Sequence, residues 1–132
     1  MPLIRISLKR GKSREHIQSI LDGVYDATRA SFNVPDNDRF MLVSQHDEGE
    51  FVYGSGFLGI ERSDDLVIIQ ITAAGRTLAQ KRALYRDIAE RLSIKPGLRP
   101  QDVFISLVGV QREDWSFGNG EAQLAPVAEV SP

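Results

Sequence analysis

The chain has 132 residues, of which 42% are hydrophobic and 26% are charged, and this length suits one globular domain. The 16 Lys and Arg residues against 18 Asp and Glu residues give a net charge of −2, whereas nucleic-acid-binding proteins usually carry an excess of positive charge. Cysteine is absent and histidine occurs only twice, so we expect no disulfide and no metal site built from thiolates or several histidines. No apolar run is long enough to span a membrane and no signal peptide is recognisable, so we expect a cytoplasmic protein that binds neither membranes nor nucleic acid.

The sequence contains an internal repeat. Aligned with itself at an offset of 64 residues, the chain shows the same order of elements in both halves without a gap. Gly11-Lys12-Ser13 then falls on Gly75-Arg76-Thr77, and Asp38 falls on Asp102. We therefore predict a single domain over residues 1–132, made of two strand–helix–strand units. The units span about residues 2–45 and 66–110, and an aromatic, glycine-containing loop and a tail follow over 111–132.

The first unit begins with a strand over 3–8, where apolar and polar residues alternate. Ser13 follows a glycine and is a good N-cap for a helix that ends near Phe32. A second strand is predicted over 39–44. The glycine-containing stretch 45–65 is expected to be a loop with short irregular strands.

The second unit begins with a nearly unbroken apolar run over 66–71, which is typical of a strand covered on both faces. Thr77 is the expected N-cap of the second helix, which ends before Pro96, and the last strand is predicted over 103–108. Strand–helix–strand units imply parallel pairing. The sequence thus predicts an α/β fold, a four-stranded mixed sheet with both helices on one face. The other face would expose apolar residues in a monomer, so we expect an oligomer.

Pro2 is the first candidate for chemistry. Removal of a methionine before a small residue would leave Pro2 at the N-terminus, and a free prolyl nitrogen is a secondary amine that can act as an acid, a base or an iminium former. The structural alternative is that Pro2 only begins a strand, where its missing N–H costs nothing.

Arg76 is predicted at the start of the second helix, where unpaired backbone N–H groups favour anions and an arginine could hold a carboxylate. A solvated surface arginine is the alternative. Trp115 and Phe117 lie in a glycine-containing loop after the last strand, where they line a pocket or fill the core. Asp38 is either a turn residue or a positioned carboxylate.

Pro2, the repeated unit, Gly75-Arg76-Thr77 and the run 115–118 together resemble the tautomerase superfamily, and within it the malonate semialdehyde decarboxylases. The likeness runs from residue 2 to about 123. It implies the tautomerase (macrophage-migration-inhibitory-factor-like) fold, a homotrimer that covers the bare sheet face, a small oxo-acid substrate and no cofactor. Ala74 stands where the better-known decarboxylases have a first arginine, so the chain is similar to their Ala-Gly-Arg-Thr subgroup.

The resemblance also implies roles for individual residues. The prolyl ammonium polarises the carbonyl of a 3-oxo acid while an arginine holds its carboxylate, so the expected catalytic residues are Pro2, Asp38 and Arg76. Arg76, Trp115, Phe117 and Leu124 are expected to bind the substrate, although Leu124 replaces an aromatic residue of the better-known form.

Three functions are consistent with these residues. The first is decarboxylation of malonate semialdehyde to acetaldehyde and carbon dioxide, with a cationic Pro2. The second is keto–enol tautomerisation of a compound of the phenylpyruvate or 4-oxalocrotonate type, in which a neutral Pro2 moves the proton. The third is a trimeric interaction protein without catalysis, which would be insensitive to replacement of Pro2.

Overall fold

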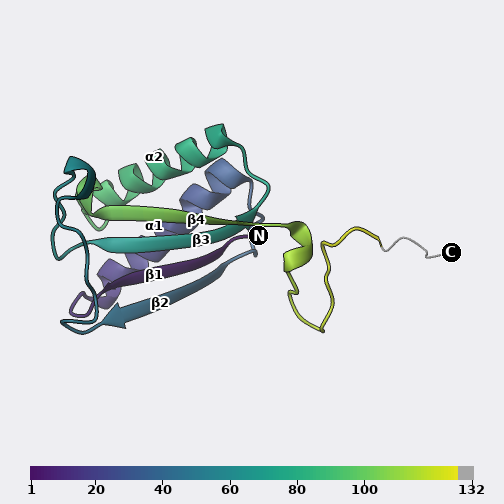
Figure 1. Ribbon diagram of the computed structural model, residues 1–132, viewed down its shortest axis with the longest axis horizontal. Helices are drawn as coiled ribbons and strands as arrows, with labels where there is room; N and C mark the ends of the chain where they lie inside the picture. The colour runs from purple at the N-terminus through teal and green to yellow at the C-terminus, as the bar shows by residue number, and fades with distance from the viewer. Residues whose placement is uncertain (128–132) are drawn as a thin grey trace.

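The computed structural model describes residues 1–127 (Figure 1). Four strands and two α-helices occur in the order β1 (Leu3–Lys9), α1 (Arg14–Phe32), β2 (Phe40–His46), β3 (Val67–Ala74), α2 (Leu78–Ile94) and β4 (Val103–Val110). Short 3-10 turns are η1 (Phe57–Gly59), η2 (Pro100–Asp102) and η3 (Arg112–Asp114). The predicted strand–helix–strand order is confirmed in both halves, and each strand continues one to three residues beyond its predicted end.

The strands form one mixed sheet in the order β2-β1-β3-β4. β1 pairs in parallel with β2 and β3 with β4, whereas β1 and β3 are antiparallel and place Leu3 opposite Thr72. Because of this arrangement, the starts of β1 and β2 and the ends of β3 and β4 meet at one edge of the sheet. We call it the Pro2 edge, and the N label in Figure 1 marks it.

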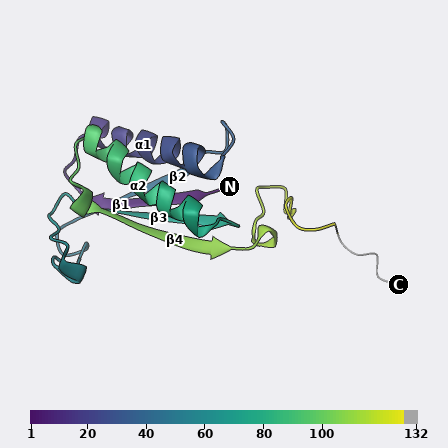
Figure 2. The same ribbon diagram turned by 90° about the horizontal axis from the view of Figure 1, so that it is seen from above.

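Both helices lie side by side on one face of the sheet, as Figure 2 shows from above. Ser13 caps α1 by accepting a hydrogen bond from the backbone of His16 at 3.0 Å. Thr77 caps α2 in a reciprocal capping box with Gln80. The helices pack closely because α1 carries Gly23, where an added Cβ would lie 2.9 Å from the Leu92 side chain.

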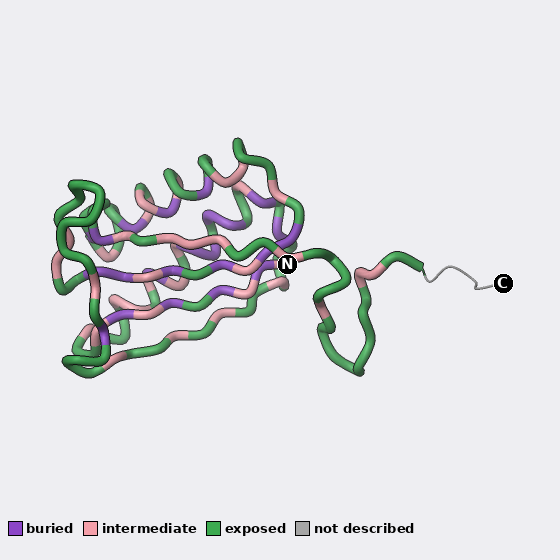
Figure 3. The backbone as a smooth tube through the Cα atoms, viewed as in Figure 1, coloured by how far each residue is buried: buried purple, intermediate pink, exposed green. Residues whose placement is uncertain are grey.

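The core lies between the helices and the sheet, and the central strands β1 and β3 hold most of its buried strand residues (Figure 3). On the outer strands, alternate residues face the other way and remain exposed. Phe40 is 56% and Leu42 47% exposed on β2, and Phe104 is 40% and Val108 37% exposed on β4. Within residues 1–127, no helix covers this open face of the sheet, as the sequence predicts.

The expectation of short irregular strands over 45–65 is wrong. β2 extends through His46, and the rest of the stretch contains the single 3-10 turn η1 and no strand. Its end is fixed by side chains instead, because Asp102 accepts hydrogen bonds of 2.7 Å from both the backbone N–H and the hydroxyl of Ser63. In the described part of the chain, no helix is long and apolar enough to cross a membrane.

Candidate active site

The strand arrangement brings Pro2 to a small cavity at the Pro2 edge. Pro2 is buried just before β1, and the cavity of about 220 Å³ is lined by Pro2, Leu3, Asp38, Phe40, Trp115, Ser116 and Phe117. Four predicted site residues therefore line one cavity, namely Pro2, Asp38, Trp115 and Phe117. In this structure Met1 precedes Pro2, so the chain's amino group is carried by Met1.

Asp38 faces that amino group. Its carboxylate lies 2.6 Å from the Met1 nitrogen, and the Asp38 side chain is only 14% exposed. The loop before β2 that carries Asp38 is held to α1, because the hydroxyl of Tyr25 donates a hydrogen bond to the carbonyl of Asp36. Arg39 adds a second attachment, since its guanidinium lies 4.4 Å from the ring centre of Tyr25. Asp38 is thus a positioned carboxylate at the cavity.

Trp115 and Phe117 form one wall of the cavity. Their rings stack with centroids 5.5 Å apart and an angle of 13° between planes. Gln123 fixes this loop, because its side chain accepts a hydrogen bond from the Phe117 backbone N–H at 2.9 Å and donates one to the Gly118 carbonyl at 2.8 Å. The wall therefore keeps an apolar surface toward Pro2 and Asp38.

Arg76 lies beside this cavity and lines a smaller one of about 170 Å³ with Phe32 and Ala73 among its neighbours. Its guanidinium sits 4.8 Å from the ring centre of Phe32 and donates to the Phe32 carbonyl at 3.3 Å and to the Ala74 carbonyl. Burial lowers the pKa of Arg76, and the carboxylate of Asp38 partly offsets this by favouring the charged form. The guanidinium thus lies within electrostatic reach of Asp38.

Leu124 does not join the Pro2 cavity within one chain. It lines a separate cavity of about 480 Å³ with Gln111, Arg112, Glu113 and Pro126. Beyond the loop that carries Trp115 and Phe117, the chain runs away from the sheet, as Figures 1 and 2 show. The predicted tail continues past residue 127, outside the described residues.

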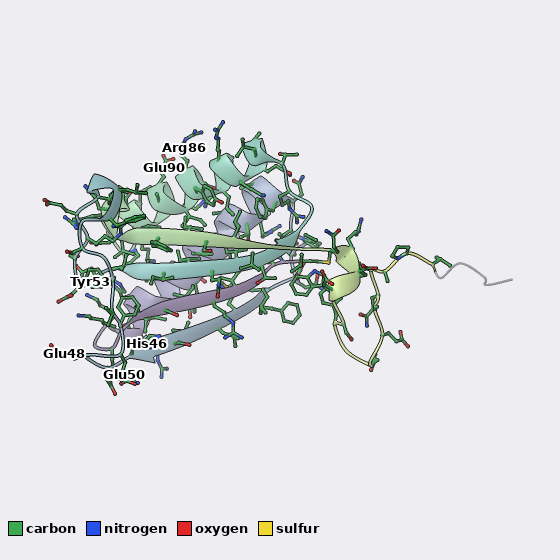
Figure 4. All side chains as sticks on the ribbon, viewed as in Figure 1. His46, Glu48, Glu50, Tyr53, Arg86 and Glu90 are labelled. Carbon is green, nitrogen blue, oxygen red and sulfur yellow. The ribbon has the colours of Figure 1, made fainter. Side chains whose placement is uncertain are left out.

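A larger cavity, about 510 Å³, lies at the opposite edge of the sheet and includes Lys9, Lys12 and His46. Figure 4 shows His46 and Glu48 at that end, and Figure 1, drawn from the same direction, marks the N-terminus at the other end. Its cations are already paired: Lys9 lies 2.9 Å from Asp64, and Lys12, the repeat counterpart of Arg76, pairs with Asp65. Leu66 is the repeat counterpart of Pro2 and is fully buried. This edge therefore carries the repeat counterparts of Arg76 and Pro2, which are Lys12 and Leu66, but no N-terminal amine.

Four residues that shape the site were not predicted from the sequence. Leu3, Phe40 and Ser116 line the Pro2 cavity, and Tyr25 holds the loop that carries Asp38. Phe40 could have been found as an apolar residue at the start of the strand predicted over 39–44, two residues after Asp38. Tyr25 gives no local signal, because its partner Asp36 belongs to another element.

Comparison with known proteins identifies the family of the chain. The family model described as "Tautomerase enzyme" matches residues 38–118, a range that contains Asp38, Arg76 and both wall aromatics. The chain belongs to the tautomerase family. It is 42% identical over 125 residues to the probable tautomerase YusQ of Bacillus subtilis, covering 94% of this chain and 98% of that protein. The probable tautomerase YrdN of the same organism is 35% identical over 124 residues, covering 94% of this chain and 96% of that protein.

Solved structures of other tautomerase-fold proteins extend the comparison. A malonate semialdehyde decarboxylase is 36% identical with a TM-score of 0.87, covering 92% of this chain and 95% of that chain. A second malonate semialdehyde decarboxylase, inhibited by 3-bromopropiolate, is 39% identical with a TM-score of 0.84, covering 92% of each chain. A fused 4-OT, described as a symmetric trimer, shares the fold at 20% identity with a TM-score of 0.75, covering 92% of this chain and 97% of that chain. This member of the tautomerase family is therefore structurally similar to malonate semialdehyde decarboxylases.

Proposed function

We propose that this tautomerase-family enzyme decarboxylates malonate semialdehyde or a closely related small 3-oxo acid, with Pro2 as its N-terminal residue after loss of Met1. The observation that carries the proposal is that Pro2 and Asp38 line one cavity with the apolar wall of Trp115 and Phe117. That cavity of about 220 Å³ is smaller than the roughly 300–1,000 Å³ usual for drug-sized ligands. It favours a substrate of a few carbon atoms.

The proposed reaction needs one acid, one carboxylate-binding residue and an apolar wall. The ammonium of Pro2 donates a hydrogen bond to the carbonyl oxygen of the substrate, and Arg76 holds the carboxylate. The bond between the carboxylate carbon and C2 breaks, carbon dioxide leaves, and the electron pair of that bond forms the enolate of acetaldehyde. Pro2 gives its proton to C2 of the enolate and takes another proton from water, so no cofactor is required.

Asp38 and the aromatic wall support this step. Asp38 keeps the ammonium oriented toward the cavity. Trp115 and Phe117 present an apolar surface that favours neutral carbon dioxide over the carboxylate anion.

We further propose that the enzyme is a homotrimer. The outer strands of the open face expose Phe40, Leu42, Phe104 and Val108, and exposed apolar patches often mark an interface. Fused 4-OT structures of the same fold are described as trimers. Three open faces packed around a common axis would bury these side chains.

Keto–enol tautomerisation is the second candidate, because both curated relatives are named probable tautomerases. In that reaction a neutral Pro2 takes the proton from the enol oxygen and returns it to carbon, and no carbon–carbon bond breaks. Substrates of the phenylpyruvate or 4-oxalocrotonate type would test it.

The experiment is a proton NMR time course of malonate semialdehyde, after mass spectrometry has verified loss of Met1. Wild type is compared with Pro2→Ala and with Pro100→Ala, which changes an exposed proline at the opposite edge of the sheet. We expect acetaldehyde from wild type and Pro100→Ala, and at least a 100-fold slower rate from Pro2→Ala. Ketonisation of enol-phenylpyruvate without acetaldehyde would support the tautomerase instead. If Pro2→Ala keeps the full rate, the role of Pro2 is wrong.

A further inference from the structure

Two arginines, Arg76 and Arg112, follow the ends of the neighbouring strands β3 and β4 at the Pro2 edge. β3 and β4 are parallel, and Ala74 pairs with Val110 where both strands end. Arg76 follows Ala74 by two residues, and Arg112 follows Val110 by two residues. Arg112 opens η3, and Trp115 of the Pro2 cavity comes directly after that turn. The register therefore brings both side chains to the same edge as Pro2.

Arg76 alone has limited capacity to hold a carboxylate. Two of its nitrogens donate to the backbone carbonyls of Phe32 and Ala74, and its Nε is buried without a hydrogen-bond partner within residues 1–127. A guanidinium offers five N–H donors, and a carboxylate offers about four acceptor positions. With part of its donors engaged, Arg76 leaves acceptor positions of a bound carboxylate unfilled. The second residue before it is Ala74, so β3 itself provides no further cation.

Arg112 has its donors available. Its side chain is exposed and makes no hydrogen bond or ion pair with another described residue. Its neighbour Asp114 is engaged, because the Asp114 carboxylate accepts the backbone N–H of Gln111 at 2.7 Å. Glu113 lines the same cavity as Arg112 and Leu124. Arg112 and Leu124 thus line one cavity, which within a single chain is separate from the Pro2 cavity.

The two guanidinium groups also act on one another. Besides burial, the charge of Arg112 lowers the pKa of Arg76, while Asp38 raises it. Asp38 is itself 2.6 Å from the chain's amino group. Glu113 lines the same cavity as Arg112 and offsets part of its charge. Because Asp38 already contacts the amino group, the two arginines still favour an anion at this edge of the sheet.

We propose that Arg112 is a second substrate-binding residue, which holds the carboxylate of the oxo acid together with Arg76. The inference rests on the proposed function, since the carboxylate is that of its substrate. Arg112 fills the acceptor positions that Arg76 leaves open, and it sets the affinity for the acid rather than the rate of bond breaking.

The test compares Arg112→Gln and Arg112→Lys with Arg86→Gln, a matched loss of charge on the outer surface of α2, where Figure 4 labels Arg86. Two quantities are measured for each: KM and kcat with malonate semialdehyde, and Kd for malonate by isothermal titration calorimetry. Arg112→Gln should raise KM and Kd about tenfold and change kcat less than threefold, because it removes charge-assisted hydrogen bonds to a bound acid. Arg112→Lys should recover part of the affinity, and Arg86→Gln should match wild type.

The outcomes separate this inference from the proposed function. If wild type yields no acetaldehyde while malonate binding still depends on Arg112, the decarboxylase assignment fails and the carboxylate-binding role stands. If Arg112→Gln and Arg86→Gln have equal KM and Kd, the role of Arg112 is overturned and the decarboxylase can remain. If wild type neither binds malonate nor converts the semialdehyde, both are overturned.

Discussion

The carboxylate of Asp38 lies 2.6 Å from the amino nitrogen of Met1, at the edge where β1 and β2 begin. Among the residues that line the Pro2 cavity, Asp38 is the one acid. Loss of Met1 would move the amine by one residue, about 3.8 Å along the chain, toward the wall formed by Trp115 and Phe117. The same carboxylate would then face the prolyl amine from the rim of the cavity.

Asp38→Asn should therefore impair catalysis more than folding. The amide keeps the size of the side chain but cannot hold the ammonium by charge, so we expect kcat to fall about 10- to 100-fold. The free energy of unfolding should change by less than about 1 kcal/mol, since the ion pair is partly exposed. Steady-state kinetics and urea denaturation measure the two effects. Asp36→Asn is the control, because Asp36 is an exposed carboxylate of the same loop; equal kcat values for the two variants would contradict the role of Asp38.

Tyr25→Phe tests whether the loop that carries Asp38 is held from α1. The variant removes the hydroxyl that donates to the Asp36 carbonyl, so we expect about 1 kcal/mol less stability and a three- to tenfold lower kcat. Tyr85→Phe, on α2, is the control and should leave kcat unchanged. The loss of kcat should disappear when Asp38 is already Asn, because Tyr25 acts through Asp38. An undiminished loss in that double variant would show a purely structural role.

Much of this fold could be predicted because its signals are local. Ser13 and Thr77 are the observed N-caps of α1 and α2, and the apolar alternation of β1 places its buried residues against the helices. The repeat then fixes the order of both halves. Pro2, Asp38 and Arg76 lie at the same edge because β1 and β2 are parallel, β3 and β4 are parallel, and β1 and β3 are antiparallel.

The parts that could not be predicted depend on contacts between distant residues. The stretch before β3 is held by Asp102, 39 residues beyond Ser63, and no local pattern reveals that bond. Within a single chain Leu124 lines a different cavity from Pro2, a placement that no local pattern reveals. Arg112 gives no signal until the register of β3 and β4 is known.

Asp102 should contribute stability that depends on pH. Burial would raise its pKa, but hydrogen bonds from Arg99 and Ser63 outweigh burial, so its pKa lies below the ordinary value of 3.8. A carboxyl whose pKa is lowered by folding stabilises the protein above pH 3.8 and loses that contribution as the pH falls through the folded value. Asp102→Asn should therefore cost about 2 kcal/mol at pH 7.

Urea denaturation of wild type and Asp102→Asn between pH 7 and about pH 3 checks this, and the difference in free energy of unfolding should shrink at the acid end. Asp26→Asn is the control, because Asp26 is exposed on α1 and makes no ion pair with another described residue, and its replacement should have little effect at any pH. A difference that stays constant with pH would mean that the ionisation of Asp102 does not stabilise the fold.

The open face of the sheet can be tested through Phe104. Its neighbours Val103 and Ile105 pack against the core, so Phe104 points to the opposite face and stays 40% exposed in the single chain. In a trimer formed through this face, Phe104→Glu would bury an unpaired charge, which is costly, so the variant should elute as a monomer in size-exclusion chromatography with light scattering. Val52→Glu is the control, because Val52 is 87% exposed in the loop after β2, and it should remain a trimer. A Phe104→Glu protein that is still trimeric would place the interface on another surface, whereas a monomeric wild type would refute the trimer itself.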